Sequence, residues 1–446
     1  MEERSIVLPR QVALALERME QHGFEAFAVG GCVRDSLLGR APNDWDITTN
    51  ARPQEILQCF ADHRVIETGI RHGTVTVLLD SMPLEMTTYR NDGEYLDNRH
   101  PVQVTFSDRL EDDLSRRDFT VNAMAYHPQK GIVDLFGGRE DLAAGVIRCV
   151  GDAQTRFEED GLRILRAIRF ASVLNFSLDS QTAAAVHTCR GLLSNIAAER
   201  IREEFCKLLC GRGAVPILRE YIDVIGEFLP ELQRAVGFDQ NTKYHCYDVF
   251  EHTLCALSLC SPDLVTRLAV LLHDIGKPLC YTEDENGGHF KGHVQVGVEL
   301  TDQILHRLKF DHATVERLKL QVELHDLPIS ADKRAVKRLM RRMADEDILR
   351  LMEVKKCDRL AHAEFFRTLP PELEQIPAVV HQIRADDECL SLKTLQIKGG
   401  DLMAIGIPAG KRMGEILQAL LEDVMDEKLP NEKSTLLQAA QQMMNQ

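Results

Sequence analysis

The sequence predicts an α+β protein of several domains, with mixed α and β structure at the start and helices in the remaining two thirds. Three observations predict this class. The chain has 446 residues, about three times the usual domain length of roughly 150. Strand and helix patterns alternate over the first 150 residues. From Arg156 onward the strand pattern disappears, and apolar residues recur at helical spacing.

The expected elements follow from hydrophobic periodicity and from turn-forming residues. In the first domain we expect a helix over residues 9–21 and a strand over Ala26–Val29. Two β-rich runs, residues 75–79 and 84–88, are split by the turn-forming segment 80–83. Beyond this domain the helical spacing is clearest over residues 162–174, 197–209, 264–272 and 413–424.

Glycine-containing breaks divide the chain further. They fall near Gly151, over residues 237–242, at Gly287-Gly288 and at Gly399-Gly400. We therefore predict four domains, over residues 1–150, 151–240, 241–365 and 366–446. The sequence has no internal repeat and no low-complexity tract.

Composition and charge exclude several classes of protein. With 44% hydrophobic and 27% charged residues, the chain is neither disordered nor collagen-like. A net charge of −16 repels polyanions at long range, so binding to RNA would need local basic patches. The 12 cysteines are scattered without a C-x-x-C pair, which indicates reduced thiols. No leader and no stretch of about 18 apolar residues is found, so we expect a soluble, cytoplasmic protein without membrane association.

The first group of candidate functional residues combines glycines with carboxylates. Gly30 and Gly31 lie where a strand meets a helix, so that backbone N–H groups can approach a phosphate, although such a pair alone is more often a chain reversal. Asp44 and Asp46 would share one face of a strand and could share divalent cations, the alternative being a surface helix cap. Glu85 adds a carboxylate from a further β-rich run. Together these residues predict Mg²⁺-dependent nucleotidyl transfer.

The second group is a stripe of charge on a largely apolar helix. Asp160, Arg163, Arg166 and Arg169 are spaced by three, and the residues between them predict a buried helix. The alternative is a solvated face with internal ion pairs. Buried arginines need anionic partners, which a nucleoside triphosphate would supply. The acceptors of Asp160 and the donors of Arg163 match the amine and ring nitrogen of cytosine and adenine.

The third group consists of histidines and aspartates in helical sequence. His252, His273, Asp274 and Asp358 are the predicted ligands, and the pattern also includes His293 and His325-Asp326. Neutral imidazoles and a bridging carboxylate suit one or two divalent metals that activate water for phosphoester cleavage. The alternative is that the histidines are buried for structural reasons.

Two later segments bear on RNA. Residues 333–342 carry six positive charges in ten residues at helical spacing, which suits contact with RNA phosphates or, equally, a solvated helix face. Residues 398–411 form a glycine-containing segment whose backbone amides could approach phosphates.

Five segments resemble the motifs of class II tRNA nucleotidyltransferases and bacterial poly(A) polymerases, within the polymerase-β superfamily. Gly30-Gly31-Cys32-Val33-Arg34-Asp35, followed by Asp44-Trp45-Asp46, resembles the head motif of that family. Residues 89–101 resemble its flexible loop for adding the terminal A, residues 115–123 its R-R-D-x-x-x-N-A segment, and residues 159–163 its E-D-x-x-R motif. The histidine and aspartate pattern resembles that of HD metal hydrolases.

The resemblance implies the domain roles and the site residues. The four domains become a polymerase-β-like head, a base-selecting and RNA-binding neck, an HD domain and a tRNA-binding tail. The predicted catalytic residues are Asp44, Asp46 and Glu85, of which Asp44 and Asp46 would bind Mg²⁺. The implied nucleotide-binding residues are Gly30, Gly31 and Arg34 for the triphosphate, Arg117 and Asp118 for triphosphate and sugar, Asn122 for the nucleotide, Asp160 and Arg163 for the base, and Arg166 and Arg169 for the base or phosphates.

The implied activity is template-independent addition of CCA to the 3′ end of tRNA from CTP and ATP, with release of pyrophosphate. The HD site would hold Ni²⁺, Mn²⁺ or Mg²⁺, and phosphohydrolase activity there is a further expectation. The alternatives are a poly(A) polymerase, an enzyme adding only CC or only A, and an HD phosphohydrolase whose head only binds RNA. The presence of Asp44, Asp46 and Arg163 argues against an inert head. The oligomeric state stays open.

Overall fold

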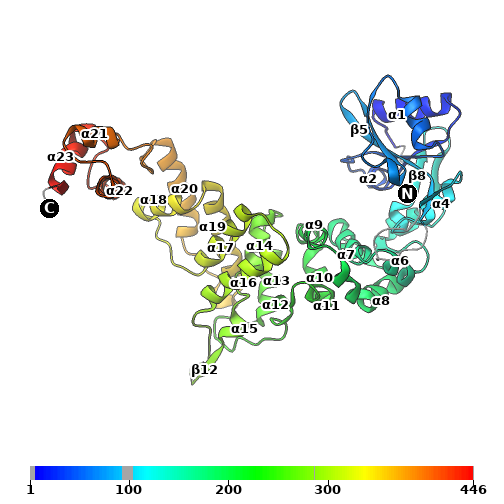
Figure 1. The fold of residues 1–446 in the computed structure, drawn as a ribbon. Coiled ribbons are helices and arrows are strands. Elements are labelled where there is room, and N and C mark those ends of the chain that lie inside the picture. Colours follow the sequence, from blue (N-terminus) through cyan, green and yellow to red (C-terminus); the bar gives the residue numbers. More distant parts are fainter. Residues whose placement is uncertain (1–5, 93–103, 286, 445–446) are drawn as a thin grey trace. The chain divides into compact units, whose positions relative to one another are not determined.

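The described part of the chain falls into two compact units. The computed structural model describes residues 6–92, 104–285 and 287–444 (Figure 1). The first unit is Met1–Gln233 and the second is Arg234–Gln446. The first unit contains a mixed sheet and the second is almost entirely helical. The predicted α+β class is therefore confirmed. No helix of the described residues is long and apolar enough to cross a membrane.

The described residues of the first unit form a seven-stranded sheet. Its order is β3-β4-β5-β2-β1-β8-β9, and only the β2–β5 pair is parallel. The strands are β1 (Ala26–Val29), β2 (Asp46–Thr49), β3 (Arg64–Ile66), β4 (Thr74–Leu79), β5 (Met82–Thr88), β8 (Met124–His127) and β9 (Gly131–Asp134). The inner strand β1 is apolar and buried throughout, whereas β4 buries alternate residues, as expected for a strand with one face in the core.

Short helices and small strand pairs complete the first unit. The helices are α1 (Arg10–Gln21), α2 (Gly31–Leu37), α3 (Pro53–Cys59), α4 (Leu110–Ser115), α5 (Gly138–Ala144), α6 (Ala153–Glu159), α7 (Leu162–Leu174), α8 (Ser180–Cys189), α9 (Ala198–Leu209), α10 (Ala214–Glu220), α11 (Ile222–Gly226) and α12 (Pro230–Gln233). The small pairs are β6 (Arg90–Asp92) with β7 (Val104–Phe106) and β10 (Val146–Ile147) with β11 (Ser177–Leu178). The predicted strand β1 and helix α7 have the predicted bounds.

The second unit is built from helices α13 to α23. They are α13 (Val249–Ser258), α14 (Leu264–Leu272), α15 (Lys277–Cys280), α16 (His293–Arg307), α17 (His312–Leu324), α18 (Lys333–Arg342), α19 (Asp345–Ala361), α20 (Glu372–Ala385), α21 (Gly399–Ala404), α22 (Lys411–Met425) and α23 (Lys433–Met444). One buried apolar cluster lies between residues 324 and 383 and another between residues 389 and 440.

Two expectations about strands after Arg156 are wrong. The pair β10–β11 includes residues 177–178, and β12 (Thr282–Asp284) pairs with β13 (Gly287–His289) in a hairpin. The expected loop at Gly287-Gly288 is therefore a strand. Its glycines serve close packing, because a Cβ on Gly288 would lie 2.3 Å from the carbonyl oxygen of Gln240.

Helices α7 and α9 pack closely where the chain leaves α9. The hydroxyl of buried Ser172 on α7 donates to the carbonyl of Leu208 at 2.6 Å. A Cβ on Gly211 would lie 2.1 Å from that hydroxyl oxygen. This contact leaves no room for a side chain at residue 211.

We predict that Gly211→Ala destabilises the protein by about 1–3 kcal/mol, because the added methyl group overpacks the α7–α9 contact. The matched control is Gly191→Ala, where an added Cβ meets nothing within 4 Å. Thermal unfolding followed by calorimetry should show a lower Tm for the first variant alone. Equal melting temperatures would contradict the close packing described above.

Candidate nucleotide and metal sites

The turn between β1 and α2 brings backbone close to the predicted nucleotide residues. Gly30 has φ 83° and ψ −129°, a conformation that favours glycine. A Cβ at this position would lie 3.0 Å from Nη1 of Arg117, so a side chain there would crowd the arginine. The predicted glycine turn at the end of the first strand therefore exists, and it faces a predicted triphosphate residue.

A chain of polar contacts joins the other predicted nucleotide residues. Nη1 of Arg34 donates to the side-chain oxygen of Asn122 at 2.6 Å, and the Asn122 amide donates to Asp118 at 3.1 Å. The other carboxylate oxygen of Asp118 accepts from Nε of Arg166 at 2.8 Å. Arg34 and Asp118 are buried, and the structure unites residues from three separate sequence segments.

The carboxylates next to this network lie on two paired strands. Asp46 begins β2 and lies opposite Glu85 in the parallel pairing with β5. Burial raises the pKa of Asp46 to about 6, with the negative charges of Asp44 and Glu85 adding to the effect and Arg117 opposing it. A divalent cation would relieve this repulsion, so the donor set fits one.

The expectation that Asp44 lies on the strand is wrong. Strand β2 begins at Asp46, and Asp44 is an exposed residue of the preceding loop. Its carboxylate still influences Asp46 electrostatically. Because the loop rather than the strand pleat positions Asp44, its direction could not follow from the alternation of strand residues.

The charged stripe differs from its prediction in two respects, which are the position of Asp160 and the partners of Arg163. Asp160 lies between α6 and α7 rather than on a helix, and its carboxylate accepts from the backbone N–H of Leu162 at 3.0 Å. Arg163 is buried and donates to Glu159 at 2.5 Å and to the Arg116 carbonyl at 3.0 Å.

The remaining arginines also find carboxylates within the chain. Arg166 pairs with Asp118, and Nε of Arg169 donates to Glu204 at 2.7 Å. Protein carboxylates therefore pair with these side chains, as the alternative of internal ion pairs expected, and contact of these arginines with a nucleotide stays a prediction. Selection of the base by this segment stays a prediction. Residues 93–101 of the predicted flexible loop lie outside the described residues.

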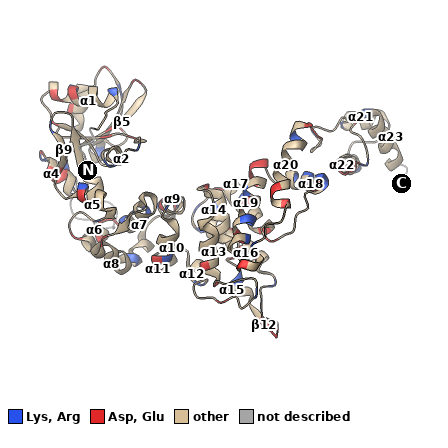
Figure 2. Ribbon diagram, turned by 180° about the vertical axis from the view of Figure 1, so that it is seen from behind, with Lys and Arg blue, Asp and Glu red and all other residues tan. Residues whose placement is uncertain are grey.

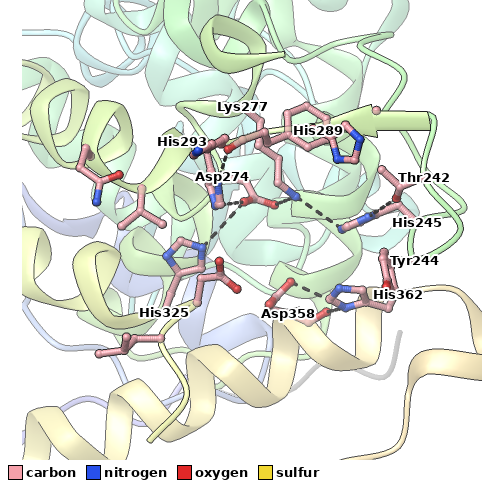
Figure 3. Close-up of a pocket in the computed structure, with 18 of the residues that line it drawn as sticks. Thr242, Tyr244, His245, Asp274, Lys277, His289, His293, His325, Asp358 and His362 are labelled. Atoms are coloured by element: carbon pink, nitrogen blue, oxygen red, sulfur yellow. Dashed lines mark hydrogen bonds and ion pairs between the residues drawn. The ribbon is translucent and has the colours of Figure 1, made fainter. Parts of the chain in front are cut away.

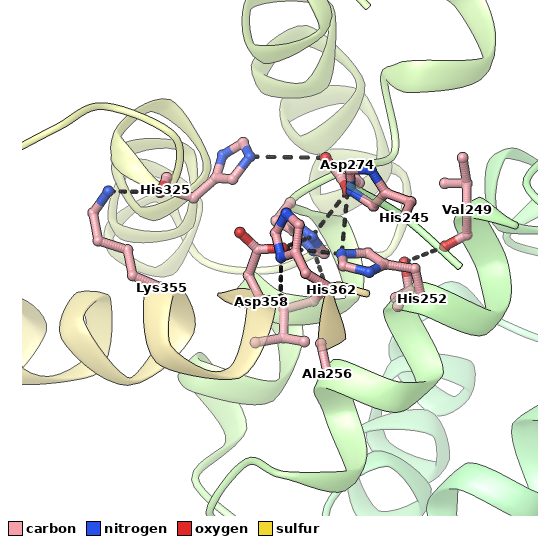
Figure 4. Close-up of polar contacts among 12 residues, drawn as sticks. His245, Val249, His252, Ala256, Asp274, His325, Lys355, Asp358 and His362 are labelled. Atoms are coloured by element: carbon pink, nitrogen blue, oxygen red, sulfur yellow. Dashed lines mark hydrogen bonds and ion pairs between the residues drawn. The ribbon is translucent and has the colours of Figure 1, made fainter. Parts of the chain in front are cut away.

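In the second unit, helix ends place four predicted ligands together. Asp248 caps the start of α13 and puts His252 in its first turns, and the apolar helix α14 ends directly before His273 and Asp274. Nε2 of His252 lies 2.9 Å from the carboxylate of Asp358 on α19 (Figure 4). One ligand atom from each of these four residues lies within 4.8 Å of the other three.

Two buried atoms of this group lie where a metal ion could bind. Nε2 of His273 is buried and makes no hydrogen bond among the described residues, and it lies 3.1 Å from Oδ2 of Asp274, which is also 2.6 Å from the ammonium group of Lys277. Nδ1 of His273 contacts the carbonyl of Val270 at 2.7 Å, which leaves Nε2 to bind a metal or a proton. Burial would lower the pKa of His273, but the carboxylates of Asp274 and Asp358 raise it to about 10.

A second group of ligands shares Asp274. His293 and His325 place Nε2 3.7 Å and 3.8 Å from its other oxygen, Oδ1. Nδ1 of each contacts a backbone carbonyl three residues earlier, and burial lowers the pKa of His325 to about 4, which favours the neutral form that binds metals. The predicted ligand set lacked these two residues, although the sequence pattern contained them.

A cavity of about 930 Å³ opens onto both ligand groups. Figure 3 shows the side chains of Asp274, His293, His325 and Asp358 around it. Lys277 lies at the same wall, where its ammonium group is 2.6 Å from Asp274 and 2.9 Å from the side-chain oxygen of Gln240. Cationic and imidazole side chains thus surround the carboxylate that the two groups share, which suits an anionic ligand.

Family models match three parts of the chain. The poly A polymerase head domain matches residues 26–148, and the probable RNA and SrmB-binding site of polymerase A matches residues 175–235. A model described as tRNA nucleotidyltransferase domain 2, putative, matches residues 294–440.

A CCA-adding enzyme from Levilactobacillus brevis is 34% identical over 439 residues, which is 97% of this chain and 98% of that enzyme. The chain belongs to the family of CCA-adding enzymes. The CCA-adding enzyme from Lactobacillus delbrueckii subsp. bulgaricus is 49% identical, but the match spans about half of each protein, 48% of this chain and 53% of that enzyme. The crystal structure of Bacillus stearothermophilus CCA-adding enzyme in complex with CTP has a TM-score of 0.75 and 29% identity, and the match covers 98% of both chains.

Membership in the CCA-adding enzyme family confirms the predicted nucleotidyltransferase family. Among the described residues, the tight three-ligand groups are those around Asp274, and the head carboxylates form no such group. The structure therefore contains groups that can bind a divalent metal, while the identity of each metal and the role of each residue stay predictions.

The positively charged residues within 333–342 pair mostly with carboxylates of the same chain. Lys and Arg gather on α18 (Figure 2). Lys337 is buried against Glu388 at 2.5 Å, and Arg338 lies 3.0 Å from Asp426. Most of these charges are neutralised within the chain, so the prediction of a phosphate contact here loses its main support. A role for residues 398–411, which contain α21 and the start of α22, stays a prediction.

We predict that Asp118→Asn lowers stability by about 2 kcal/mol near neutral pH. Burial would raise the pKa of Asp118, but Arg166 and Asn122 lower it from 3.8 to about 2. The folded carboxyl group therefore binds its proton less readily than the unfolded one. Its stabilising effect is present above the unfolded pKa and is lost as the pH falls from about 4 through about 2.

Calorimetry of both proteins over this pH range tests the prediction. The difference in Tm should stay constant at higher pH and shrink below about pH 4. A difference that persists unchanged at about pH 2.5 would show that the effect comes from packing rather than charge.

Proposed function

We propose that the chain adds CCA to the 3′ end of tRNA without a template, using CTP and ATP and releasing pyrophosphate. One observation carries this proposal. Arg34, Asn122 and Asp118 form one hydrogen-bonded network, and Arg117, whose charge acts on the carboxylate of Asp46, lies beside the backbone of Gly30. Family membership and the likeness to an enzyme solved in complex with CTP support the same activity.

In this proposal the network holds the nucleotide for in-line attack. The backbone of Gly30 and Gly31 approaches the triphosphate, with Arg34 and Arg117 supplying charge-assisted hydrogen bonds. Asp118 and Asn122, already fixed by each other, orient the sugar. Mg²⁺ bound by the carboxylates Asp44, Asp46 and Glu85 would lower the pKa of the tRNA 3′ hydroxyl and neutralise the leaving pyrophosphate.

Base selection requires Asp160 and Arg163 to exchange partners. The acceptor oxygens of Asp160 would receive the exocyclic amine of cytosine or adenine, while Arg163 would donate to the ring nitrogen. Arg163 would leave Glu159 for this purpose, and Arg166 and Arg169 would remain near Asp118 and Glu204. Uracil and guanine present the reverse pattern and would be rejected.

The domain scheme belongs to the same proposal. Residues 1–150 act as head, 151–240 as neck, 241–365 as HD domain and 366–446 as tail, and tRNA is held by neck and tail. The enzyme would work in the cytoplasm, where tRNA is found. Poly(A) polymerase activity and addition of CC or A alone are the alternatives.

A second proposed function is metal-dependent phosphoester hydrolysis at the HD site. It is supported by the buried Nε2 of His273, which makes no hydrogen bond among the described residues, and by the two ligand groups that share Asp274. Ni²⁺, Mn²⁺ or Mg²⁺ held there would activate water as the nucleophile. The chain's own contribution is to hold the imidazoles in the metal-binding tautomer and to surround the phosphate with cationic groups.

We predict that Asp46→Asn reduces Mg²⁺-dependent nucleotide addition to below about a tenth of the wild-type rate, because it removes a charge that holds the metal. Binding of tRNA, measured by filter retention, should stay nearly unchanged. The control is Asp80→Asn, an exposed aspartate in the β4–β5 turn whose φ of 47° asparagine tolerates well. If Asp46→Asn keeps more than a tenth of the rate, the metal assignment is wrong.

Asp160→Ala should narrow the preference for CTP and ATP over UTP and GTP. A bidentate contact of this kind is worth about 1–3 kcal/mol of discrimination. Arg34→Ala serves as the comparison, because loss of a triphosphate contact should weaken all four nucleotides alike. The measurement is kcat/KM for each nucleotide on tRNA ending before CCA and on tRNA ending in CC. An unchanged ratio of CTP to UTP in Asp160→Ala would remove the base-selecting role.

Nucleotide addition and metal-dependent hydrolysis should be separable by mutation. We expect His273→Ala to abolish metal-dependent hydrolysis, for example of a 2′,3′-cyclic phosphate, and to leave nucleotide addition intact, since the HD ligands and the head network lie in different compact units. His306→Ala, an exposed histidine of α16 outside both ligand groups, is the control. Loss of addition by folded His273→Ala would show that the activities are coupled.

A further inference from the structure

We propose that Asp113 is a positioning residue for nucleotide addition, which holds the guanidinium group of Arg117 in place beside the strand that carries Asp46. This inference rests on the proposed nucleotidyl transfer. Asp113 lies on α4, two residues before the segment 115–123, and the sequence predictions did not include it. Its side chain is fully buried.

Each carboxylate oxygen of Asp113 accepts hydrogen bonds from a different part of the first unit. Oδ1 accepts from Nε and Nη2 of Arg116 at 2.9 Å and 2.6 Å. Oδ2 accepts from Nη2 of Arg117 at 3.1 Å and from the hydroxyl of Thr48 at 3.0 Å. One oxygen therefore binds Arg116, and the other joins Arg117 to strand β2.

The contact with Thr48 connects Asp113 to the candidate magnesium site. Thr48 lies on β2 two residues after Asp46, and alternate residues of a strand point to the same face of the sheet. The buried hydroxyl of Thr48 also lies 3.3 Å from the carbonyl oxygen of Thr87 on β5. Asp113 therefore lies on the face of the sheet to which the Asp46 side chain belongs.

Arg117 depends on Asp113 for its orientation. Among the described residues, the contact with Asp113 is the one hydrogen bond that the Arg117 guanidinium makes. Its Nε is buried and has no hydrogen-bond partner in that part of the chain. Its Nη1 lies beside the turn between β1 and α2, 3.0 Å from the place of a Cβ on Gly30. Nη2 is thus fixed, while Nε and Nη1 are left to donate to an anionic ligand at the turn.

The charges of this group favour a bound triphosphate. One carboxylate faces two guanidinium groups, so one positive charge stays uncompensated within the group. Burial would raise the pKa of Asp113, but the charges of Arg116 and Arg117 lower it, so the carboxylate is ionised near neutral pH. Without that negative charge the two arginines would repel each other, and Arg117 would lose the contact that directs it toward the turn.

The first test removes the charge of Asp113 and keeps the shape of its side chain. The variant is Asp113→Asn, assayed in the full chain for addition of CTP to tRNA ending before CCA. Its matched control is Asp141→Asn, because Asp141 is also buried and also accepts from a threonine and an arginine, Thr120 at 2.6 Å and Arg148 at 3.1 Å. Neither of those partners is a predicted nucleotide residue.

We expect Asp113→Asn to raise KM for CTP about tenfold, the scale of one hydrogen bond to a charged group, with kcat lowered less than about threefold. KM should not change in Asp141→Asn. In an Arg117→Ala background, Asp113→Asn should add less than about twofold, because the residue through which it acts is absent. An unchanged KM, an equal rise in both aspartate variants, or independent effects of the substitutions at 113 and 117 would overturn the positioning role.

Thr48→Val keeps the proposal testable if Asp113→Asn does not fold. It removes the hydroxyl that ties Asp113 to β2 and leaves both ion pairs in place. The matched control is Thr88→Val, which removes an equally buried hydroxyl of the neighbouring strand β5 that donates to the carbonyl of Ala51. We expect KM for CTP to rise about threefold in Thr48→Val alone. Equal KM values in the two threonine variants would overturn the role.

A failure of the proposed nucleotidyl transfer gives a different result. In that case the wild-type protein adds no nucleotide to any tRNA transcript. Isothermal titration calorimetry of CTP with Mg²⁺ present then tests the positioning role directly. Weaker binding of CTP by Asp113→Asn than by Asp141→Asn, or by Thr48→Val than by Thr88→Val, supports the role, and equal binding within each pair overturns it.

Discussion

The buried carboxylate of Asp118 is the contact on which the candidate nucleotide site depends. One of its oxygens accepts from Asn122, which in turn accepts from Arg34, and the other accepts from Arg166 on α7. The carboxylate therefore ties the turn after β1 to the first long helix beyond the sheet. Because burying an unpaired charge is costly, these groups fix one another's positions before a nucleotide binds.

The carboxylate of Asp274 is to the candidate metal site in the second unit what the carboxylate of Asp118 is to the candidate nucleotide site. Its two oxygens face different sets of imidazoles, those of His252 and His273 on one side and those of His293 and His325 on the other. Backbone carbonyls at the ends of helices hold most of these rings in one orientation. The ligand geometry is thus set by helix termini, which explains why an all-helical region can build a compact metal site.

The sequence predicted the elements whose signal is local. The apolar runs of β1, α7 and α14 give their bounds directly, and the spacing of His252, His273, Asp274 and Asp358 identified a cluster that the structure brings together. The predictions that failed concerned contacts between residues that are distant in sequence. Glu204, 35 residues after Arg169, pairs with it, and no periodicity indicates this partner.

Other failures have equally physical causes. Asp44 and Asp160 lie in loops at the ends of regular elements, where neither a period of two nor one of 3.6 applies. The positive charges of α18 pair with acidic residues elsewhere in the second unit, such as Glu323, Glu388 and Asp426. A count of positive charges in the sequence does not show these partners, and it therefore suggested a free basic face. His293 and His325 needed the fold to show that they point at the same carboxylate as His273.

The most direct test of the account is to incubate the purified protein with tRNA transcripts ending before CCA, after C and after CC, with each nucleoside triphosphate singly and together. With the proposed activity, CTP alone extends the first transcript to CC, ATP alone extends the transcript ending in CC by one A, and the two together stop at CCA. A long A tail, extension by UTP or GTP at a comparable rate, or no extension of any transcript would contradict it.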